Sequence, residues 1–93
     1  MKYRIFITKG YRSSYKRISR HKYFDLELVE KVIDQLANGK VLSPKYKDHQ
    51  LTGSLKEYRE CHIKNDLLLM YQKQDEMLIL SLVDIGTHSN MFG

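Results

Sequence analysis

The strongest constraint on the fold is segment 58–71, in which two strand patterns flank a short polar turn. The first arm alternates, so Glu60 and His62 share one of its two faces. Residues 64–66 predict the turn, because Asn and Asp tolerate left-handed backbone and bond to their own main chain. Residues 67–71 are apolar throughout, which is typical of a strand covered on both faces. The segment therefore predicts a β-hairpin within a packed sheet.

Four further segments show regular patterns. Residues 2–8 alternate as a first strand, and residues 77–83 alternate as the last strand of a meander that begins with the hairpin. Apolar residues recur at helical spacing over 11–18, and Asp25 predicts the N-cap of a second helix that ends at residues 38–39. We expect an α+β domain with an antiparallel sheet of about four strands and two N-terminal helices packed on one face. The expected order is βααβββ, followed by a short C-terminal tail.

The length of 93 residues predicts a single domain, residues 1–93, because a chain this short supports one small core. The sequence has no apolar run of about 18 residues, and its N-terminus is a charged strand pattern without a signal-peptide core. The single cysteine, Cys61, cannot form an internal disulfide and fits a reducing compartment. We expect a cytoplasmic protein without a membrane partner.

Basic residues are concentrated at the N-terminal end, where residues 1–24 contain no acid. Helical spacing places Arg12, Lys16, Arg17 and Arg20 on the outer face of the first helix. A field of this sign favours polyanions, because Lys and Arg on phosphates give affinity that is independent of sequence. The same charges also fit a solvated helix face or a docking surface for an acidic protein.

Three of the four histidines lie where the strand patterns break. His49 falls in the long loop 40–57, His62 directly precedes the hairpin turn, and His88 follows the last strand. Simple counting puts the end of that strand at the opposite end of the meander from His62. We therefore expect His88 to reach His62 only if the sheet twists strongly and the chain after Val83 folds back. No histidine pair has the short spacing of a zinc site, so we predict neither a metal nor another cofactor.

Three motifs in order resemble the YafQ branch of the RelE/ParE toxin superfamily. They are Tyr46-Lys47-Asp48-His49 with Leu51 and Gly53; Tyr58-Arg59-Glu60-Cys61-His62 with Asp66-Leu67-Leu68-Leu69 and Tyr71; and Gly86-Thr87-His88-Ser89 with Phe92. The similarity is strongest over residues 45–93. Members of that family are bacterial ribosome-dependent mRNA endonucleases, each paired with an antitoxin, and the family places the first strand inside a four-stranded sheet.

The resemblance implies a toxin of a type II toxin-antitoxin system that cuts mRNA in the decoding site by metal-independent attack of the 2′-hydroxyl. The implied partners are a DinJ-like antitoxin, mRNA on the ribosome and ribosomal RNA. His88 is the favoured general acid, and the base stays open among the other catalytic candidates. The implied catalytic residues are His49, His62, Asp66 and His88, with Lys47, Arg59 and Phe92 in supporting roles beside the basic residues of the first helix.

Two departures from the family pattern lead to an alternative. Asp84 stands where YafQ-like toxins usually carry an arginine for the scissile phosphate. Either a neighbour such as Lys47 or Arg59 supplies the charge, or cleavage is weak, or the substrate sits differently. Leu67 stands where some members have tryptophan, which removes a stacking surface. The alternative is a non-catalytic or weakly active relative that acts by binding a protein target or its antitoxin.

Overall fold

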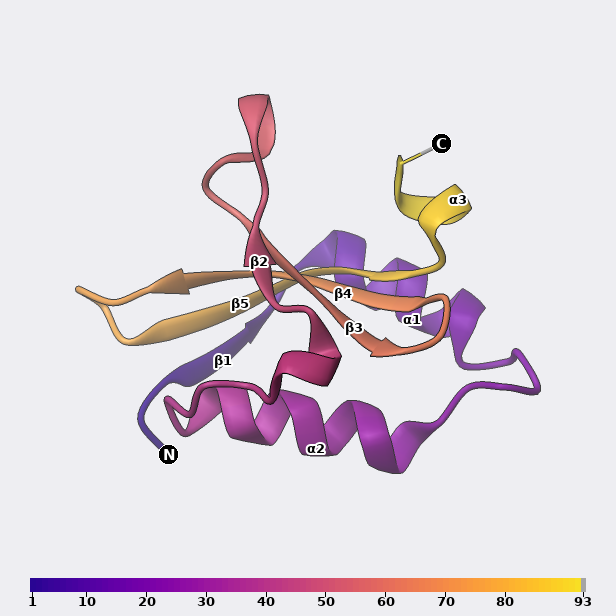
Figure 1. Cartoon of the computed structure of the whole chain (residues 1–93), viewed down its shortest axis with the longest axis horizontal. Helices are drawn as coiled ribbons and strands as arrows, with labels where there is room; N and C mark the ends of the chain where they lie inside the picture. The colour runs from indigo at the N-terminus through magenta and orange to yellow at the C-terminus, as the bar shows by residue number, and fades with distance from the viewer. Residues whose placement is uncertain (93) are drawn as a thin grey trace.

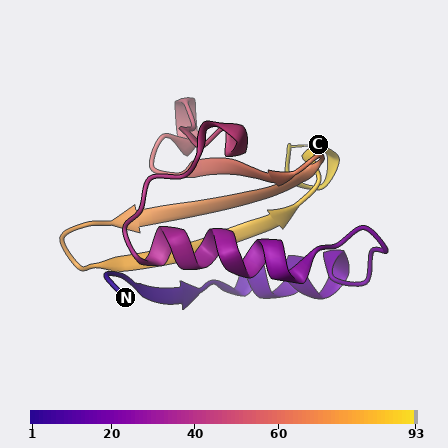
Figure 2. The ribbon, with the colours of Figure 1, turned by 60° about the horizontal axis from the view of Figure 1, so that its bottom comes forward.

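The computed structural model describes residues 1–92 and contains one mixed β-sheet of five strands, with the two longer helices on one face (Figure 1, Figure 2). Two single 3₁₀ turns, Pro44–Tyr46 and Gly53–Leu55, lie on either side of the shortest strand. The elements in chain order are β1 (Arg4–Ile7), α1 (Lys9–Ile18), α2 (Leu26–Ala37), β2 (His49–Gln50), β3 (Arg59–Lys64), β4 (Leu67–Gln74), β5 (Ile79–Gly86) and α3 (His88–Phe92).

The strand order is β1-β5-β4-β3-β2, and the central hairpin and meander are confirmed. The prediction of an antiparallel sheet of about four strands was wrong in two respects. β1 runs parallel to β5 at the edge of the sheet, because the chain crosses through α1 and α2 before it returns. β2 adds a fifth strand at the other edge, and its two residues are too few to show a sequence period.

Both predicted helices form, each with a side-chain cap at its N-terminus. The Asp25 carboxylate accepts the backbone N–H of Leu28 at 3.1 Å, as predicted for the second helix. The hydroxyl of Thr8 accepts the N–H of Tyr11 at 3.1 Å and donates to the carbonyl of Leu82 at 2.8 Å, so it also ties the start of α1 to β5. The basic residues predicted on the outer face of the first helix are exposed: Arg12, Lys16, Arg17 and Arg20.

The core lies between the two helices and one face of the sheet. It is formed by the apolar stripe of each helix and by alternate residues of the strands, and it includes Tyr11, Val29, Val32, Leu36, Cys61, Leu69, Tyr71, Leu80, Leu82 and Ile85. At about 25 cal/mol per Å² of apolar area, this burial is the main stabilising term of so small a domain. The intervening strand residues face away from the helices, and this second face carries the candidate site.

A register shift in β5 determines which of its residues reach the second face. Met70 pairs with Asp84, whereas the next residue, Tyr71, pairs with Leu82, so Val83 is an extra residue in β5. Such a bulge reverses the alternation that follows it. Leu82 and Ile85 therefore both enter the core, and Asp84 is brought to the face opposite the helices.

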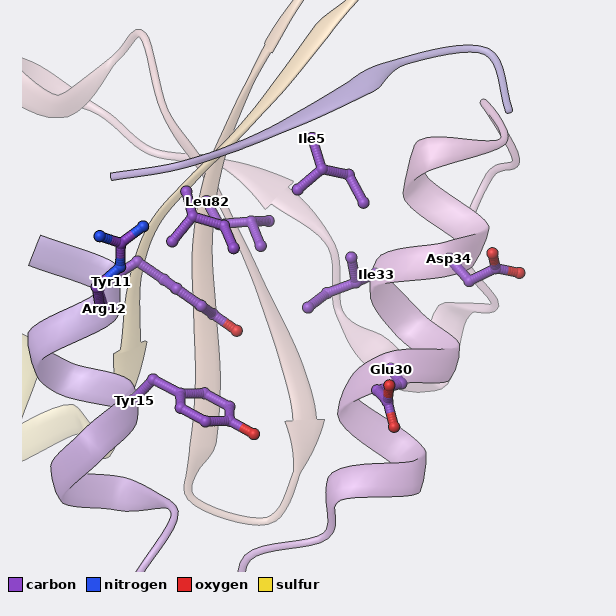
Figure 3. Close-up of a pocket in the computed structure, with 9 residues that line it drawn as sticks. Ile5, Tyr11, Arg12, Tyr15, Glu30, Ile33, Asp34 and Leu82 are labelled. Atoms are coloured by element: carbon purple, nitrogen blue, oxygen red, sulfur yellow. The ribbon is translucent and has the colours of Figure 1, made fainter. Parts of the chain in front are cut away.

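An apolar groove of about 400 Å³ opens between α1 and α2 on the helix face (Figure 3). Ile5 and Leu82 form its floor, Tyr11 and Tyr15 line it from α1, and Ile33 lines it from α2. The groove lies on the other face from the histidines discussed below. Within residues 1–92, no helix combines the length and the hydropathy that a membrane span requires.

Candidate active site

Two rows of residues that pair across the strands build the candidate site on the second face. One row runs from His49 in β2 through Glu60 and Met70 to Asp84. The parallel row runs from His62 in β3 through Leu68 to Gly86 in β5. Directly paired residues of antiparallel strands project to the same face, so the register alone gathers these side chains.

The three histidines singled out by the sequence lie in a continuous series. The ring centroids of His49 and His62 are 6.4 Å apart, and those of His62 and His88 are 5.9 Å apart. Phe92 continues the series, with its ring centroid 5.8 Å from that of His88. Residues separated by up to 43 positions in the chain therefore meet at one end of the sheet.

The predicted obstacle to placing His88 beside His62 was wrong. Successive antiparallel strands alternate in direction, so β3 and β5 run in the same direction and finish at the same end of the sheet. Figure 1 shows the end of β5 beside the β3–β4 turn. Gly86 allows α3 to pack closely against the end of β5, because a Cβ atom at this position would lie only 3.3 Å from Cβ of Asn90. No fold-back of the segment directly after Val83 is needed, because that segment is still strand.

Glu60 is a site residue that the sequence reasoning did not select. Its side chain is only 4% exposed, and its Oε1 lies 3.4 Å from Nε2 of His62 and 3.9 Å from Nε2 of His49. A buried carboxylate needs such partners, because burying an uncompensated charge is costly. The available signal was the alternation of the strand, which puts Glu60 on the same face as His62.

A short polar network positions the loop that carries His49. The Asp48 carboxylate accepts a hydrogen bond from the Tyr71 hydroxyl and pairs with the Arg59 guanidinium at 3.2 Å. Burial, followed by the hydrogen bond to Asp48, raises the pKa of Tyr71, so the hydroxyl stays a donor. The Lys47 carbonyl oxygen lies 2.6 Å from Nδ1 of His49. A carbonyl can only accept, so Nδ1 carries hydrogen and Nε2 is the proton acceptor of a neutral His49.

His88 and Asp66 form the exposed side of the site. The Asp66 carboxylate accepts the backbone N–H of His88 at 3.1 Å and lies 3.6 Å from its ring Nδ1. This contact joins the β3–β4 turn to the start of α3. It also leaves the far ring nitrogen of His88 directed away from Asp66.

The residues predicted for supporting roles are not all at this site. Lys47 and His62 both line a hollow of about 370 Å³, together with Lys45 and Lys64. The alternation of β3 puts Arg59 on the opposite face from His62, and the Arg59 guanidinium bonds to Asp48 and Tyr71. The basic residues of α1 belong to the helix face of the sheet, although Ile18 at the end of α1 lines a pocket that Asp66 also lines.

Asp84 lies on the face of the histidines. Its cross-strand neighbour Met70 separates it from Glu60, and its Oδ1 accepts the backbone N–H of Ile85 at 2.9 Å. That hydrogen bond gives one carboxylate oxygen a partner within β5 itself. Among residues 1–92, no three or more His, Cys, Asp or Glu side chains are grouped in a way that could hold a metal ion.

The comparisons with known proteins identify the family. A family profile described as "Bacterial toxin of type II toxin-antitoxin system, YafQ" matches residues 3–93. The chain belongs to the YafQ family of toxins. The mRNA interferase toxin YafQ of Escherichia coli strain K12 is 32% identical to it over 78 residues, which are 83% of each chain.

Solved toxin structures agree with the fold. A metal-bound toxin from Helicobacter pylori is 44% identical, with a TM-score of 0.88 over 99% of this chain and 100% of that one. In the E. coli DinJ-YafQ complex, the matched chain is 28% identical to this one, with a TM-score of 0.87 over 98% of this chain and 99% of the matched one. The predicted YafQ family is therefore confirmed, and with it a type II toxin-antitoxin toxin with an α+β fold.

Proposed function

We propose that this YafQ-family toxin is an mRNA interferase that cuts mRNA in the decoding site of the bacterial ribosome, in the cytoplasm. The observation that supports this most is the series His49, His62 and His88, in which consecutive ring centroids are 6.4 and 5.9 Å apart. A relative with 32% identity carries the name mRNA interferase toxin YafQ. A YafQ structure in complex with DinJ makes a DinJ-like antitoxin the proposed partner.

The proposed reaction is transfer of the phosphoryl group within the RNA. A base removes the proton of the 2′-hydroxyl, the 2′-oxygen bonds to phosphorus, and the bond from phosphorus to the 5′-oxygen breaks. An acid protonates the departing 5′-oxygen, which leaves a 2′,3′-cyclic phosphate and a 5′-hydroxyl. Imidazole can fill both proton roles near neutral pH, so no step needs a metal.

His88 is the proposed acid. Its ring is 60% exposed, and the Asp66 carboxylate 3.6 Å from Nδ1 orients it. Held in this way, the ring presents Nε2 to a bound substrate, where it can protonate the 5′-oxygen. Phe92 lies against the same ring and supports its position.

His49 is the favoured base. The Lys47 carbonyl holds the Nδ1 hydrogen, so Nε2 of a neutral His49 can take the proton of the 2′-hydroxyl. His62 lies between His49 and His88 and faces Glu60. In its protonated form, His62 would place positive charge on the phosphoryl oxygens, where charge develops in the transition state.

Lys47 is the proposed source of further positive charge in place of the missing arginine. It shares a hollow with His62, whereas Arg59 is engaged by Asp48 and Tyr71. The basic surface of α1, which includes Lys16 and Arg17, would contact ribosomal RNA.

Asp84 favours the second candidate, a weakly active or non-catalytic toxin that acts by binding a protein or its antitoxin. Its carboxylate lies in the row of Glu60 and would repel a phosphate on that face. Cleavage of mRNA distinguishes the two candidates, since the binder arrests growth without producing cut messages.

The test is a reconstituted translation reaction with purified toxin, followed by primer extension on the message. We expect cuts in phase with codons on ribosome-bound mRNA, their loss on adding the antitoxin, and no cuts in free mRNA. The control is His88→Ala, which should still fold and bind antitoxin. Growth arrest on expression with an uncut message would reject the nuclease and support the binder.

A further inference from the structure

A small pocket of about 270 Å³ lies next to the candidate site, between the α1–α2 link and the β3–β4 turn. His21, Tyr23 and Phe24 line it from the link. Asp66 and Leu67 line it from the turn and the start of β4. None of the proposed roles of the histidine series uses the side chains of the link.

Tyr23 is more exposed than its neighbour Phe24. The Tyr23 residue is 68% exposed, whereas Phe24 is half-buried and packs against the core. Phe24 has a different environment, since its ring meets that of Tyr15 edge-on at a centroid distance of 5.6 Å. Phe24 therefore anchors the link to α1, whereas the Tyr23 ring stays accessible to solvent, with Lys22 over one of its faces.

Basic side chains flank the Tyr23 side of the pocket, and the Asp66 carboxylate lines the opposite side. Nζ of Lys22 lies 5.0 Å from the centroid of the Tyr23 ring, and the His21 ring lies 5.8 Å from it at an angle of 43°. Lys64 lines the pocket from the turn, with its Nζ 3.7 Å from Asp25. An aromatic face with adjacent cations is the combination that binds single-stranded nucleic acid, because bases stack and phosphates pair with cations.

The pocket and the histidine series share a wall. Asp66 lines the pocket, and its carboxylate also holds the backbone N–H of His88 at 3.1 Å. Thr87 lines the pocket as well and directly precedes His88. An RNA strand whose scissile phosphate lies at His88 therefore has a neighbouring nucleotide within reach of the pocket.

We propose that this pocket binds the unpaired base of a nucleotide next to the scissile phosphate, with Tyr23 as the stacking surface. Asn65 lines the pocket from the turn, and its side-chain amide can contact the edge of the base. The pocket then determines sequence preference in the cleavage reaction. This inference rests on the proposed nuclease function and adds a subsite to it.

The kinetic test compares Tyr23→Ala, Tyr23→Phe and the control Phe6→Ala, which removes an aromatic side chain of similar exposure, 58%, from β1. Loss of one stacked base predicts that Tyr23→Ala lowers kcat/KM for ribosome-bound mRNA by about 5- to 160-fold and redistributes the cuts among codons. Tyr23→Phe keeps the stacking ring and should stay near wild type, as should Phe6→Ala. Wild-type efficiency and an unchanged cut pattern in Tyr23→Ala would overturn the subsite.

A binding test separates this subsite from the nuclease function. Titration of the wild-type protein with a 2′-deoxy-modified trinucleotide, which lacks the attacking hydroxyl, should shift the NMR signals of His21, Tyr23 and Thr87. The shifts should vanish in Tyr23→Ala, whose melting temperature should match that of the wild type. Binding without cleavage by the wild type would reject the nuclease and keep the pocket. Cleavage without shifts at these residues would reject the pocket and keep the nuclease.

Discussion

The Glu60 carboxylate lies 3.4 Å from Nε2 of His62, and its side chain is 4% exposed. A charged group in this position stabilises the fold little, because its desolvation offsets the attraction. It does orient His62, since the carboxylate attracts a protonated imidazole whose Nε2 faces it. We therefore assign Glu60 a positioning role for the histidine in the middle of the series.

Replacing Glu60 by Gln should lower kcat by about 10- to 100-fold, a smaller loss than the about 10²- to 10⁴-fold contributed by a positioned acid or base. The amide keeps the shape but loses the charge that orients His62. An unchanged kcat in Glu60→Gln would contradict this role.

His88→Ala should lower kcat by about 10²- to 10⁴-fold, because it removes the proposed proton donor. The ring is 60% exposed, so the melting temperature should stay close to that of the wild type. Asp66→Asn keeps an oxygen that can accept the N–H of His88 but loses the charge near Nδ1. Its kcat should therefore fall less than that of His88→Ala. Single-turnover cleavage on ribosomes measures both, and a smaller effect for His88→Ala than for Asp66→Asn would reverse the assignment.

Asp84→Arg should raise cleavage, if this face binds the scissile phosphate as we propose. A charge-assisted hydrogen bond contributes about 1.5–3 kcal/mol, which corresponds to about a 10- to 100-fold gain in kcat/KM. Asp84→Asn is the matched control, since it removes the repulsion and keeps an oxygen for the N–H of Ile85. Unaltered or lower activity in Asp84→Arg would argue that phosphate lies elsewhere.

Tyr71→Phe should destabilise the fold by about 1.5–3 kcal/mol, because it removes the hydroxyl that donates a hydrogen bond to the charged Asp48 carboxylate. The variant should also lower kcat, since Asp48 directly precedes His49 and holds its loop on the sheet. Chemical denaturation and ribosomal cleavage measure the two effects. A loss of stability with wild-type kcat would show that the network stabilises the fold without positioning His49.

Cys61 makes the fold sensitive to alkaline pH. Burial, then the charges of Asp48 and Glu60, raises the pKa of its thiol to about 12. Between about pH 9 and 12 the unfolded chain releases this proton while the native state keeps it, so the free energy of unfolding falls by up to about 1.4 kcal/mol per pH unit. Cys61→Ala should show a shallower decline. Identical slopes in the two proteins would contradict the shift, as would rapid alkylation of native Cys61 at pH 8.

The local elements could be predicted from the sequence because each has its own pattern. Alternation marks the central hairpin, and Asp25 marks the start of α2. The parallel pairing of β1 with β5 and the bulge at Val83 depend on how distant segments pack, and no local signal carries them. The bulge also determines which side chains of β5 lie on each face of the sheet.

The candidate site could also be predicted only in part from the sequence. Resemblance selected His49, His62 and His88, and the structure brings them together, although strand direction was miscounted for His88. Glu60 was missed because an acidic residue in a strand is ordinary until its burial is known. Arg59 looked like a free cation, and its pairing with Asp48 is a contact between a strand and a loop that sequence periodicity does not encode.

The most direct measurement is the chemistry of the cut ends. Message cleaved on ribosomes by the purified toxin is digested and analysed by mass spectrometry. Acid-base catalysis by the histidine series predicts 2′,3′-cyclic phosphate on the upstream fragment and 5′-hydroxyl on the downstream fragment. Fragments with 3′-hydroxyl and 5′-phosphate ends would show attack by water instead of the 2′-hydroxyl, and would contradict the account.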